Sequence, residues 1–286
     1  MERMVEIAVT GATGQLGGRI ARRLAERGVA QRLVVRDAAR APDLPGAEVA
    51  VAAFGDADAM RAALDGVTTL MFVSASEVPD RVAMHRTAID AAVAAGVRRF
   101  VYTSFVGAAP EATFTFARHH WHTEEHLRSL AADHTILRDN LYLDYFPLMV
   151  WPDGVIRGPG GDGRAAPVAR DDIADAAVGV LLDGSGHGGR TYDLTGPRAL
   201  TLHEVAAEMS RVTGREVSYH DETVEEAYAS RAGFGAPDWE VEGWVTTYVA
   251  IARGEMELVT DHVRRLAGHP PMTLAEYLEA NPPASS

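Results

Sequence analysis

The sequence predicts an α/β fold, with a doubly wound parallel sheet and a smaller, mostly helical C-terminal subdomain. In the first 138 residues, short apolar runs alternate with amphipathic stretches. The apolar runs are continuous, which is typical of parallel strands that helices cover on both faces. A glycine-rich turn joins the first apolar run to the first amphipathic stretch. Together, these three observations favour a sheet of the Rossmann type.

The elements of the first half follow from their hydrophobic periods. Helices are indicated by apolar residues that recur at i, i+3 and i+4, and strands by short unbroken apolar runs. The strands are expected at residues 5–9, 32–35, 48–51, 69–73, 99–103 and 134–137. The helices are expected at residues 17–27, 57–64, 80–95 and 119–132.

The pattern changes after about residue 139. Residues 153–170 are rich in glycine and have no helical period, which predicts turns. Helices are expected at 171–182 and 202–213, a strand around 191–194, and mainly helices over 221–280. We therefore expect a Rossmann domain over residues 1–150 and a substrate subdomain over residues 151–286, partly interleaved with the sheet.

Composition excludes several classes of function. The chain carries a formal net charge of −13, whereas nucleic acid and anionic membrane surfaces both attract basic proteins. No apolar run reaches the roughly 20 residues that a membrane-spanning helix needs. The chain has no cysteine, which excludes disulfides and thiolate metal sites. With no signal peptide at the start, these features predict a cytoplasmic protein, and they leave a homodimer open.

All 27 basic residues are arginine. Mechanisms that need a lysine are therefore excluded. These include Schiff-base chemistry, the Walker phosphate loop and the Tyr-x-x-x-Lys pair that protonates a carbonyl oxygen.

The most specific motif is TGATGQLGG at residues 10–18. Gly11, Gly14 and Gly17 are spaced G-x-x-G-x-x-G between a predicted strand and a predicted helix. Glycine permits a tight turn and a close approach of pyrophosphate to the backbone, and the N-terminus of the helix points at the anion. The motif predicts dinucleotide binding, and the alternative is a tight strand–helix turn without a ligand.

The end of the second predicted strand indicates which dinucleotide binds. Sites that prefer NAD usually have a carboxylate there, whereas Arg36 suits the 2′-phosphate of NADP. Asp37 would bind the ribose if the strand ended one residue later. We therefore favour NADP(H) over NAD(H). The alternative is a surface arginine paired with Asp37.

In their order along the chain, these motifs resemble those of NmrA-like atypical short-chain dehydrogenase/reductases. The resemblance is carried by TGATGQLG, VVR, FVSASEV, AAGVRRFVYTS, H-x-x-T-E, ILRDNLY and the ARDDIA of residues 169–174, and it extends over nearly the whole chain. It is strongest to the branch of bacterial NADPH:quinone oxidoreductases and triarylmethane-dye reductases. This branch implies hydride transfer from NADPH to a quinone-like aromatic acceptor. Two alternatives stay open: a tailoring oxidoreductase or monooxygenase acting on an aromatic polyketide quinone, and a non-catalytic NADP-binding redox sensor.

The resemblance also implies where the ligands bind, at the carboxyl ends of the strands. Ala53 and the pair Asp139–Asn140 depart from the family pattern. The expected cofactor residues are Thr10, Gly11, Thr13, Gly14, Gln15, Leu16, Gly17, Arg36, Ser74, Ala75, Thr103 and Ser104. The expected substrate residues are Asn140, Tyr142 and Trp151, and other aromatic side chains of an apolar pocket would be Tyr145, Phe146, Trp239, Trp244 and Tyr248, each of which is equally compatible with the core.

Residues 118–126, RHHWHTEEH, contain four histidines. The segment HTEEH satisfies the H-x-x-E-H signature of one class of zinc protease, but it supplies only two metal ligands. We therefore expect His119, His122 and His126 to lie on a solvated helix face, and we expect no metal.

By the resemblance, His120 and Glu124 occupy the positions of the Tyr-x-x-x-Lys pair. Without a lysine, reduction of ordinary ketones is disfavoured. Quinones remain suitable, because their reduced forms are stabilised as anions. His120 is the candidate catalytic acid, and the alternative is that it only lines the pocket.

Overall fold

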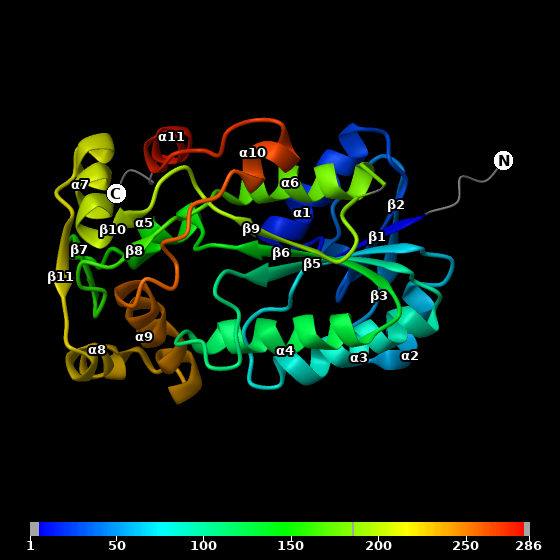
Figure 1. Cartoon of the computed structure of the whole chain (residues 1–286), viewed down its shortest axis with the longest axis horizontal. Coiled ribbons are helices and arrows are strands. Elements are labelled where there is room, and N and C mark those ends of the chain that lie inside the picture. Colours follow the sequence, from blue (N-terminus) through cyan, green and yellow to red (C-terminus); the bar gives the residue numbers. More distant parts are fainter. Residues whose placement is uncertain (1–5, 185, 283–286) are drawn as a thin grey trace.

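The structure, a computed structural model, describes residues 6–184 and 186–282. A parallel sheet of seven strands lies at its centre, in the order β3-β2-β1-β4-β5-β6-β9 (Figure 1). This sheet confirms the predicted fold class. The strand order reverses between β1 and β4, and open α/β sheets bind their ligands at such a point. The strands are β1 (Ile7–Thr10), β2 (Gln31–Val35), β3 (Ala47–Val51), β4 (Thr69–Phe72), β5 (Arg99–Phe105), β6 (Asp133–Asp139) and β9 (Arg190–Leu194).

Helices cover both faces of the sheet (Figure 1). On one face lie α1 (Gln15–Glu26), α6 (Arg170–Leu182) and α10 (His262–Ala267). On the other lie α2 (Ala57–Ala63), α3 (Arg81–Ala94) and α4 (Thr115–Ser129). No helix in the described ranges has the length and apolarity needed to cross a membrane.

The strands β1, β4, β5 and β6 bury side chains on both faces of the sheet. Val9, Met71 and Val101 pack in the cluster that includes α1 and α6. Their neighbours along the strands, such as Leu70 and Phe100, pack in the cluster that includes α2 and α3. Successive side chains of a strand point to opposite faces, so covering both faces requires the unbroken apolar runs seen in the sequence.

The C-terminal part lies at the end of the molecule that is distant from β1 (Figure 1). Two small sheets pair β7 with β11 and β8 with β10. Its strands are β7 (Val155–Gly158), β8 (Arg164–Ala165), β10 (Leu200–Thr201) and β11 (Ser218–Asp221). Its helices are α5 (Phe146–Met149), α7 (Leu202–Thr213), α8 (Val224–Arg231), α9 (Asp238–Ala252) and α11 (Leu274–Ala280). In the whole described chain, short 3-10 turns follow β2 at η1 (Ala38–Arg40), β6 at η2 (Leu143–Tyr145) and α8 at η3 (Ala232–Phe234).

Some predicted elements differ from the structure. Helix α4 begins at Thr115, before the predicted residue 119, because Phe116 and Ala117 continue its buried face. The glycine-rich segment 153–170 contains β7 and β8, which were not predicted. Strand β9 and helices α6 and α10 come from the second half of the chain but belong to the layers of the central sheet, whereas the division at residue 150 stays a prediction.

Candidate functional site

A cavity of about 350 Å³ lies at the carboxyl ends of β1, β2 and β4, where the strand order reverses. Most of the expected cofactor residues line it: Gly11, Thr13, Gly14, Gln15, Leu16, Gly17, Arg36, Ser74 and Ala75. Thr10 does not, because its hydroxyl is buried and bonded to the carbonyl oxygen of Val73 at 3.1 Å. Thr10 thus connects β1 to the end of β4.

The glycine loop forms the turn that dinucleotide binding requires. Gly11 has a φ of +63°, which favours glycine, and its carbonyl oxygen accepts from the amide of Gly14 at 2.8 Å. Gly14 is the N-cap of α1, and no side chain caps the helix. The first turn has no acidic residue, so its amide groups are available to a bound anion. This arrangement fits a pyrophosphate.

Arg36 follows β2 and lines the same cavity. It is exposed, and no ion pair joins it to Asp37 in the described part of the chain. Asp37 instead caps η1, where its carboxylate accepts from the amide of Ala39 at 3.0 Å. The guanidinium of Arg36 is therefore free to bind a phosphate, and the alternative of a pair with Asp37 is not seen.

Two buried side chains hold the loop that follows β4. The hydroxyl of Thr103 accepts from the amide of Ser74 at 2.9 Å. His85 Nε2 accepts from the amide of Ala75 at 3.0 Å, and its Nδ1 lies 3.0 Å from the hydroxyl of Thr123. Burial lowers the pKa of His85 well below its ordinary value, so the ring is neutral and accepts this bond. Thr103 is thus placed behind the cavity lining, as a support for Ser74.

Ser104 also lies behind the lining, in contact with Glu124. Its hydroxyl donates to Glu124 at 2.6 Å. The Glu124 carboxylate is fully buried and pairs with Arg138 at 2.6 Å and with Arg128 at 2.9 Å. Both carboxylate oxygens are thus occupied by cationic or hydroxyl donors. Glu124 holds β5, β6 and α4 together at the position where the resemblance implies a lysine.

His120 lies in the protein core and not at the surface of the cavity. It is buried, and its Nδ1 lies 2.8 Å from the hydroxyl of Tyr102. Burial and, after it, the charge of Arg81 lower the pKa of His120 well below its ordinary value. His120 is not part of the cavity lining. Its role as a proton donor stays a prediction.

The remaining histidines of α4 differ in exposure, contrary to the expected solvated face. Only His122 is exposed, whereas His119 and His126 are half-buried. His126 Nε2 lies 2.7 Å from the carboxylate of Asp90 on α3, so this histidine packs between helices. Within the described residues, no group of three or more histidine and carboxylate side chains is arranged to hold a metal ion.

The far end of the cavity is aromatic. Tyr142 and Tyr145 line it, with rings stacked 5.7 Å apart at an angle of 14°. The hydroxyl of Tyr142 donates to Asp139 at 3.1 Å. Burial raises the pKa of the Asp139 carboxyl and that of the Tyr142 phenol well above their ordinary values. A flat ligand would meet an aromatic surface here.

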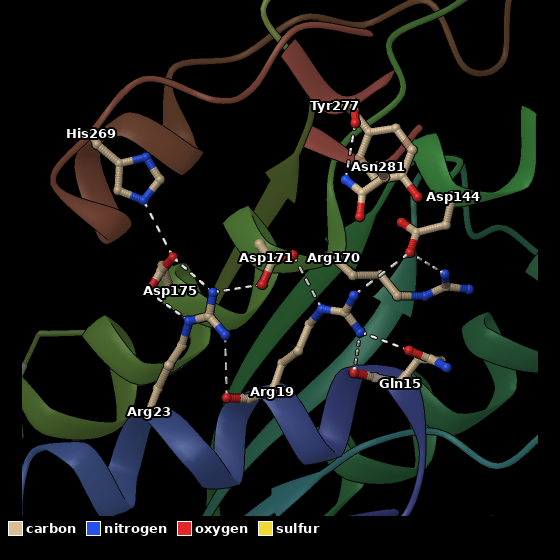
Figure 2. Close-up of polar contacts among 10 residues, drawn as sticks. All are labelled: Gln15, Arg19, Arg23, Asp144, Arg170, Asp171, Asp175, His269, Tyr277 and Asn281. Atoms are coloured by element: carbon tan, nitrogen blue, oxygen red, sulfur yellow. Dashed lines mark hydrogen bonds and ion pairs between the residues drawn. The ribbon is translucent and has the colours of Figure 1, made fainter. Parts of the chain in front are cut away.

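Arg170 joins this aromatic end to the glycine loop. Its guanidinium lies 4.4 Å from the centre of the Tyr142 ring and pairs with Asp144 at 2.7 Å. Arg19 of α1 also faces Asp144, and it donates to the carbonyl oxygen of Gln15 at 2.9 Å (Figure 2). The first turn of α1 and the tyrosines are thus positioned by one network of charges.

That network continues along α1 and α6. Arg19 pairs with Asp171 at 3.2 Å, and Arg23 pairs with Asp171 at 2.7 Å and with Asp175 at 2.8 Å (Figure 2). His269 reaches Asp175 at 3.4 Å. The pairs fix α1, whose N-terminus faces the cavity, against α6.

Two of the expected substrate residues lie outside the cavity lining. Asn140 is buried, where its amide donates to the carbonyl oxygen of Met256 at 2.9 Å. Trp151 packs on Phe234 in the C-terminal part, with ring centres 5.4 Å apart. Their contact with substrate stays a prediction.

Sequence reasoning missed two arginines of the lining, Arg81 and Arg170. Arg170 lies in the segment ARDDIA, which carried part of the family resemblance, so a signal for it was present. Arg81 begins a helix that was noted only for its amphipathic period. The sequence offered no signal that its side chain would be buried.

Comparisons with known proteins agree with this geometry. The sequence matches the NmrA-like family over residues 4–239. It is 36% identical to quinone oxidoreductase 2 of Escherichia coli K12, over 94% of this chain and 96% of that protein. Similar solved structures are an NADPH-dependent quinone oxidoreductase of Escherichia coli in complex with NADPH (TM-score 0.88, 34% identity, 96% of this chain and 99% of that one) and the Citrobacter sp. triphenylmethane reductase in complex with NADP(H) (TM-score 0.86, 30% identity, 96% and 99%).

Proposed function

The chain belongs to the NmrA-like family, as its motifs predicted, and from that premise we propose that it is an NADPH-dependent oxidoreductase that transfers hydride to a quinone-like aromatic acceptor. The observation that carries the proposal is the cavity itself. It brings the glycine loop, Arg36, which has no ion pair within the described ranges, and the stacked tyrosines together at the switch point of the sheet. The similarity to proteins named for quinone and dye reduction supports it.

Bound NADPH would supply a hydride from its nicotinamide ring. The amides at the start of α1 would bind the pyrophosphate, and Arg36 would bind the 2′-phosphate. Tyr142 and Tyr145 would hold a flat acceptor at the other end, and the backbone of Ser74 and Ala75 would lie between. Since the chain has no lysine, it cannot build the usual Tyr-x-x-x-Lys acid, which favours acceptors whose reduced form is a stable anion.

We further propose that the acceptor is a small aromatic molecule, that no nucleic acid takes part, and that the protein works in the cytoplasm. The net charge of −13 supports the absence of a nucleic-acid partner. The homodimer that the sequence left open stays a proposal.

The test is the consumption of NADPH with a panel of quinones, measured by absorbance and compared with the uncatalysed rate. We expect turnover under argon, with one quinol formed for each NADPH consumed. Tight binding of NADPH without turnover above the uncatalysed rate would support the redox sensor instead. Turnover that requires oxygen would support the monooxygenase.

Arg36→Ala is expected to weaken NADPH binding by roughly 10- to 150-fold. Charge-assisted hydrogen bonds to a phosphate are worth about 1.5–3 kcal/mol, and NADH lacks that phosphate. The dissociation constants of both cofactors would be measured by fluorescence titration. Arg40→Ala, which removes an exposed arginine from the neighbouring η1, serves as the control. Equal losses for NADPH and NADH would make Arg36 structural and Asp37 the ribose ligand.

His120→Ala is expected to lower kcat by less than about 10-fold, because His120 contacts Tyr102 and not the cavity. A positioned general acid contributes about 10²–10⁴-fold, so the two roles are well separated. Turnover would be measured below the melting temperature, with His122→Ala as the exposed control. A loss of 100-fold or more with NADPH affinity intact would identify His120 as the proton donor. Turnover abolished by a chelator would instead revive the H-x-x-E-H interpretation.

A further inference from the structure

Arg81, the first residue of α3, is a buried cation that has no ion-pair partner among the residues that the structure describes. Its side chain is 1% exposed, and both Nε and Nη1 are buried without a hydrogen bond. No ion pair involves Arg81 anywhere in residues 6–184 and 186–282. Burial of an unpaired charge is strongly unfavourable, so such a group is rare unless a ligand completes it.

Arg81 borders the candidate cofactor cavity. Arg81 lines it together with Ser74, Ala75 and Glu77. Its charge also lowers the pKa of His85 and of His120, after the effect of burial. Arg81 therefore lies at the start of α3, beside the loop that follows β4, whose Ser74 is bonded to Thr103 of β5.

The groups around Arg81 do not neutralise it. Burial and the charge of Arg81 lower the pKa of His119, as they do for His85 and His120, so these three rings are neutral. Glu77 is exposed and forms no ion pair with Arg81 in the described residues. The other lining arginine away from the exposed rim, Arg170, is already paired with Asp144. The cavity thus contains one buried cation whose counter-ion is missing from the part of the chain that the structure describes.

We propose that Arg81 binds the acceptor oxygen that becomes negatively charged during reduction, an inference that rests on the proposed function. A hydride and its two electrons reduce the quinone to the quinol monoanion and leave NADP⁺, and a proton from water then completes the quinol. Arg81 stays protonated and only donates hydrogen bonds to the oxyanion. It takes over the charge stabilisation that a Tyr-x-x-x-Lys pair supplies in related reductases.

An anionic oxygen could also come from a phosphate of NADPH. The glycine loop and Arg36 already provide the groups that phosphates need, at the ends of β1 and β2. Arg81 instead lies beside the ends of β4 and β5, and this favours the acceptor. Measuring cofactor and acceptor affinity separately distinguishes the two sources.

The experiment uses Arg81→Met, which keeps the bulk of the side chain and removes the charge. The probe is 2-hydroxy-1,4-naphthoquinone, which is anionic at neutral pH, titrated into the complex with NADP⁺ so that no hydride transfer occurs. We expect the variant to bind the probe roughly 10- to 150-fold more weakly and neutral 1,4-naphthoquinone nearly unchanged. Arg86→Met, an exposed position of the same helix, is the matched control and should bind both normally.

Turnover and cofactor affinity give a second readout. Arg81→Met should lower kcat for 1,4-naphthoquinone by about 100-fold, the usual effect of losing one oxyanion donor. The affinity for NADPH should stay within about 3-fold of the parent, far less than the loss of a charged contact. A fall in NADPH affinity with unchanged probe binding would assign the anion to the cofactor and overturn the proposal. If no quinone is turned over, the proposed function fails, whereas probe binding still tests Arg81.

Thermal unfolding without ligands separates a binding role from a structural one. Removing an unpaired buried charge should leave the melting temperature of Arg81→Met unchanged or higher. A lower melting temperature with normal probe binding would make Arg81 structural and overturn the proposal. If the Met variant does not fold, Arg81→Lys replaces it, with an expected loss of about 10-fold in probe affinity because an ammonium cannot donate two parallel bonds. Undiminished affinity in that variant would contradict the proposal.

Discussion

Replacing Gly17 with alanine is expected to abolish measurable NADPH binding and to destabilise the protein by about 1–3 kcal/mol. A Cβ on Gly17 would lie 2.6 Å from the carbonyl carbon of Gly11 and 2.8 Å from the carbonyl oxygen of Thr10, and it would be closer still to the oxygen of Gly11. All three are backbone atoms, so no side-chain rotation relieves the overlap. The turn must open, and its amides then no longer converge on the pyrophosphate.

The measurements are NADPH titration by fluorescence and thermal unfolding without cofactor. Gly233→Ala is the matched control, since nothing lies within 4 Å of its Cβ position and its φ is not positive. Gly14→Val separates the loss of NADPH binding from the loss of stability. A Cβ there meets only the oxygen of Gly11 at 3.2 Å, so the chain should fold while the branched side chain blocks the pyrophosphate and turnover is lost. Normal NADPH binding by Gly17→Ala would exclude the glycine loop as the dinucleotide site.

The central sheet could be predicted from the sequence because its signals are local. The inner strands are buried on both faces, so Val9 and Leu70 lie in unbroken apolar runs that are visible without any partner. Strand β7 had no such signal. It pairs with β11, about sixty residues later, and the hydroxyl of Tyr219 donates to the carbonyl oxygen of Gly158 at 2.7 Å. A short strand that depends on a distant partner does not show in local periodicity.

The residues of the candidate site also fall into those that a local signal predicts and those that depend on distant contacts. The glycine loop and Arg36 were predicted because each sits at a fixed place relative to one strand. Whether an arginine is buried and paired cannot be read from the residues next to it in the sequence. Arg81 and Arg170 both begin a helix. Arg81 is buried and has no partner in the part of the chain that the structure describes, whereas Arg170 pairs with Asp144 and covers Tyr142. Only the packing of separate elements determines which of them remains available to a ligand.

His120 illustrates a limit of reasoning from family positions. It occupies the position of a proton donor on α4, but its ring nitrogen is bonded to Tyr102 beneath the sheet ends. The neighbouring position on the same helix face carries Glu124, whose partners all lie within the protein. Glu124 thus connects β5, β6 and α4, whereas the proton-donor role of His120 stays a prediction that His120→Ala tests.

Glu124→Ala is accordingly expected to lower the free energy of unfolding by about 3 kcal/mol, the low end of the cost of breaking a buried ion pair. Glu124 is fully buried, and its removal leaves the hydroxyl of Ser104 without its acceptor and Arg138 with only the carbonyl oxygen of Ala108. Arg138 is partly exposed and can recover some hydration, which keeps the loss at the low end. For a chain of this size, the melting temperature should fall by roughly 5–10 °C.

Thermal and urea unfolding of the ligand-free protein would measure the loss. Glu125→Ala is the matched control: it removes the next carboxylate along α4, which is more exposed and pairs with Arg128 alone, so it should cost about 0.5 kcal/mol or less. Glu124→Gln keeps the shape but removes the charge, and it should fall between the two. If Glu124→Ala were as stable as Glu125→Ala, the carboxylate would contribute no net stability. Its burial beside Ser104 would then call for a functional explanation. A general acid–base role of Glu124, at the position where the resemblance implies a lysine, would have to be reconsidered.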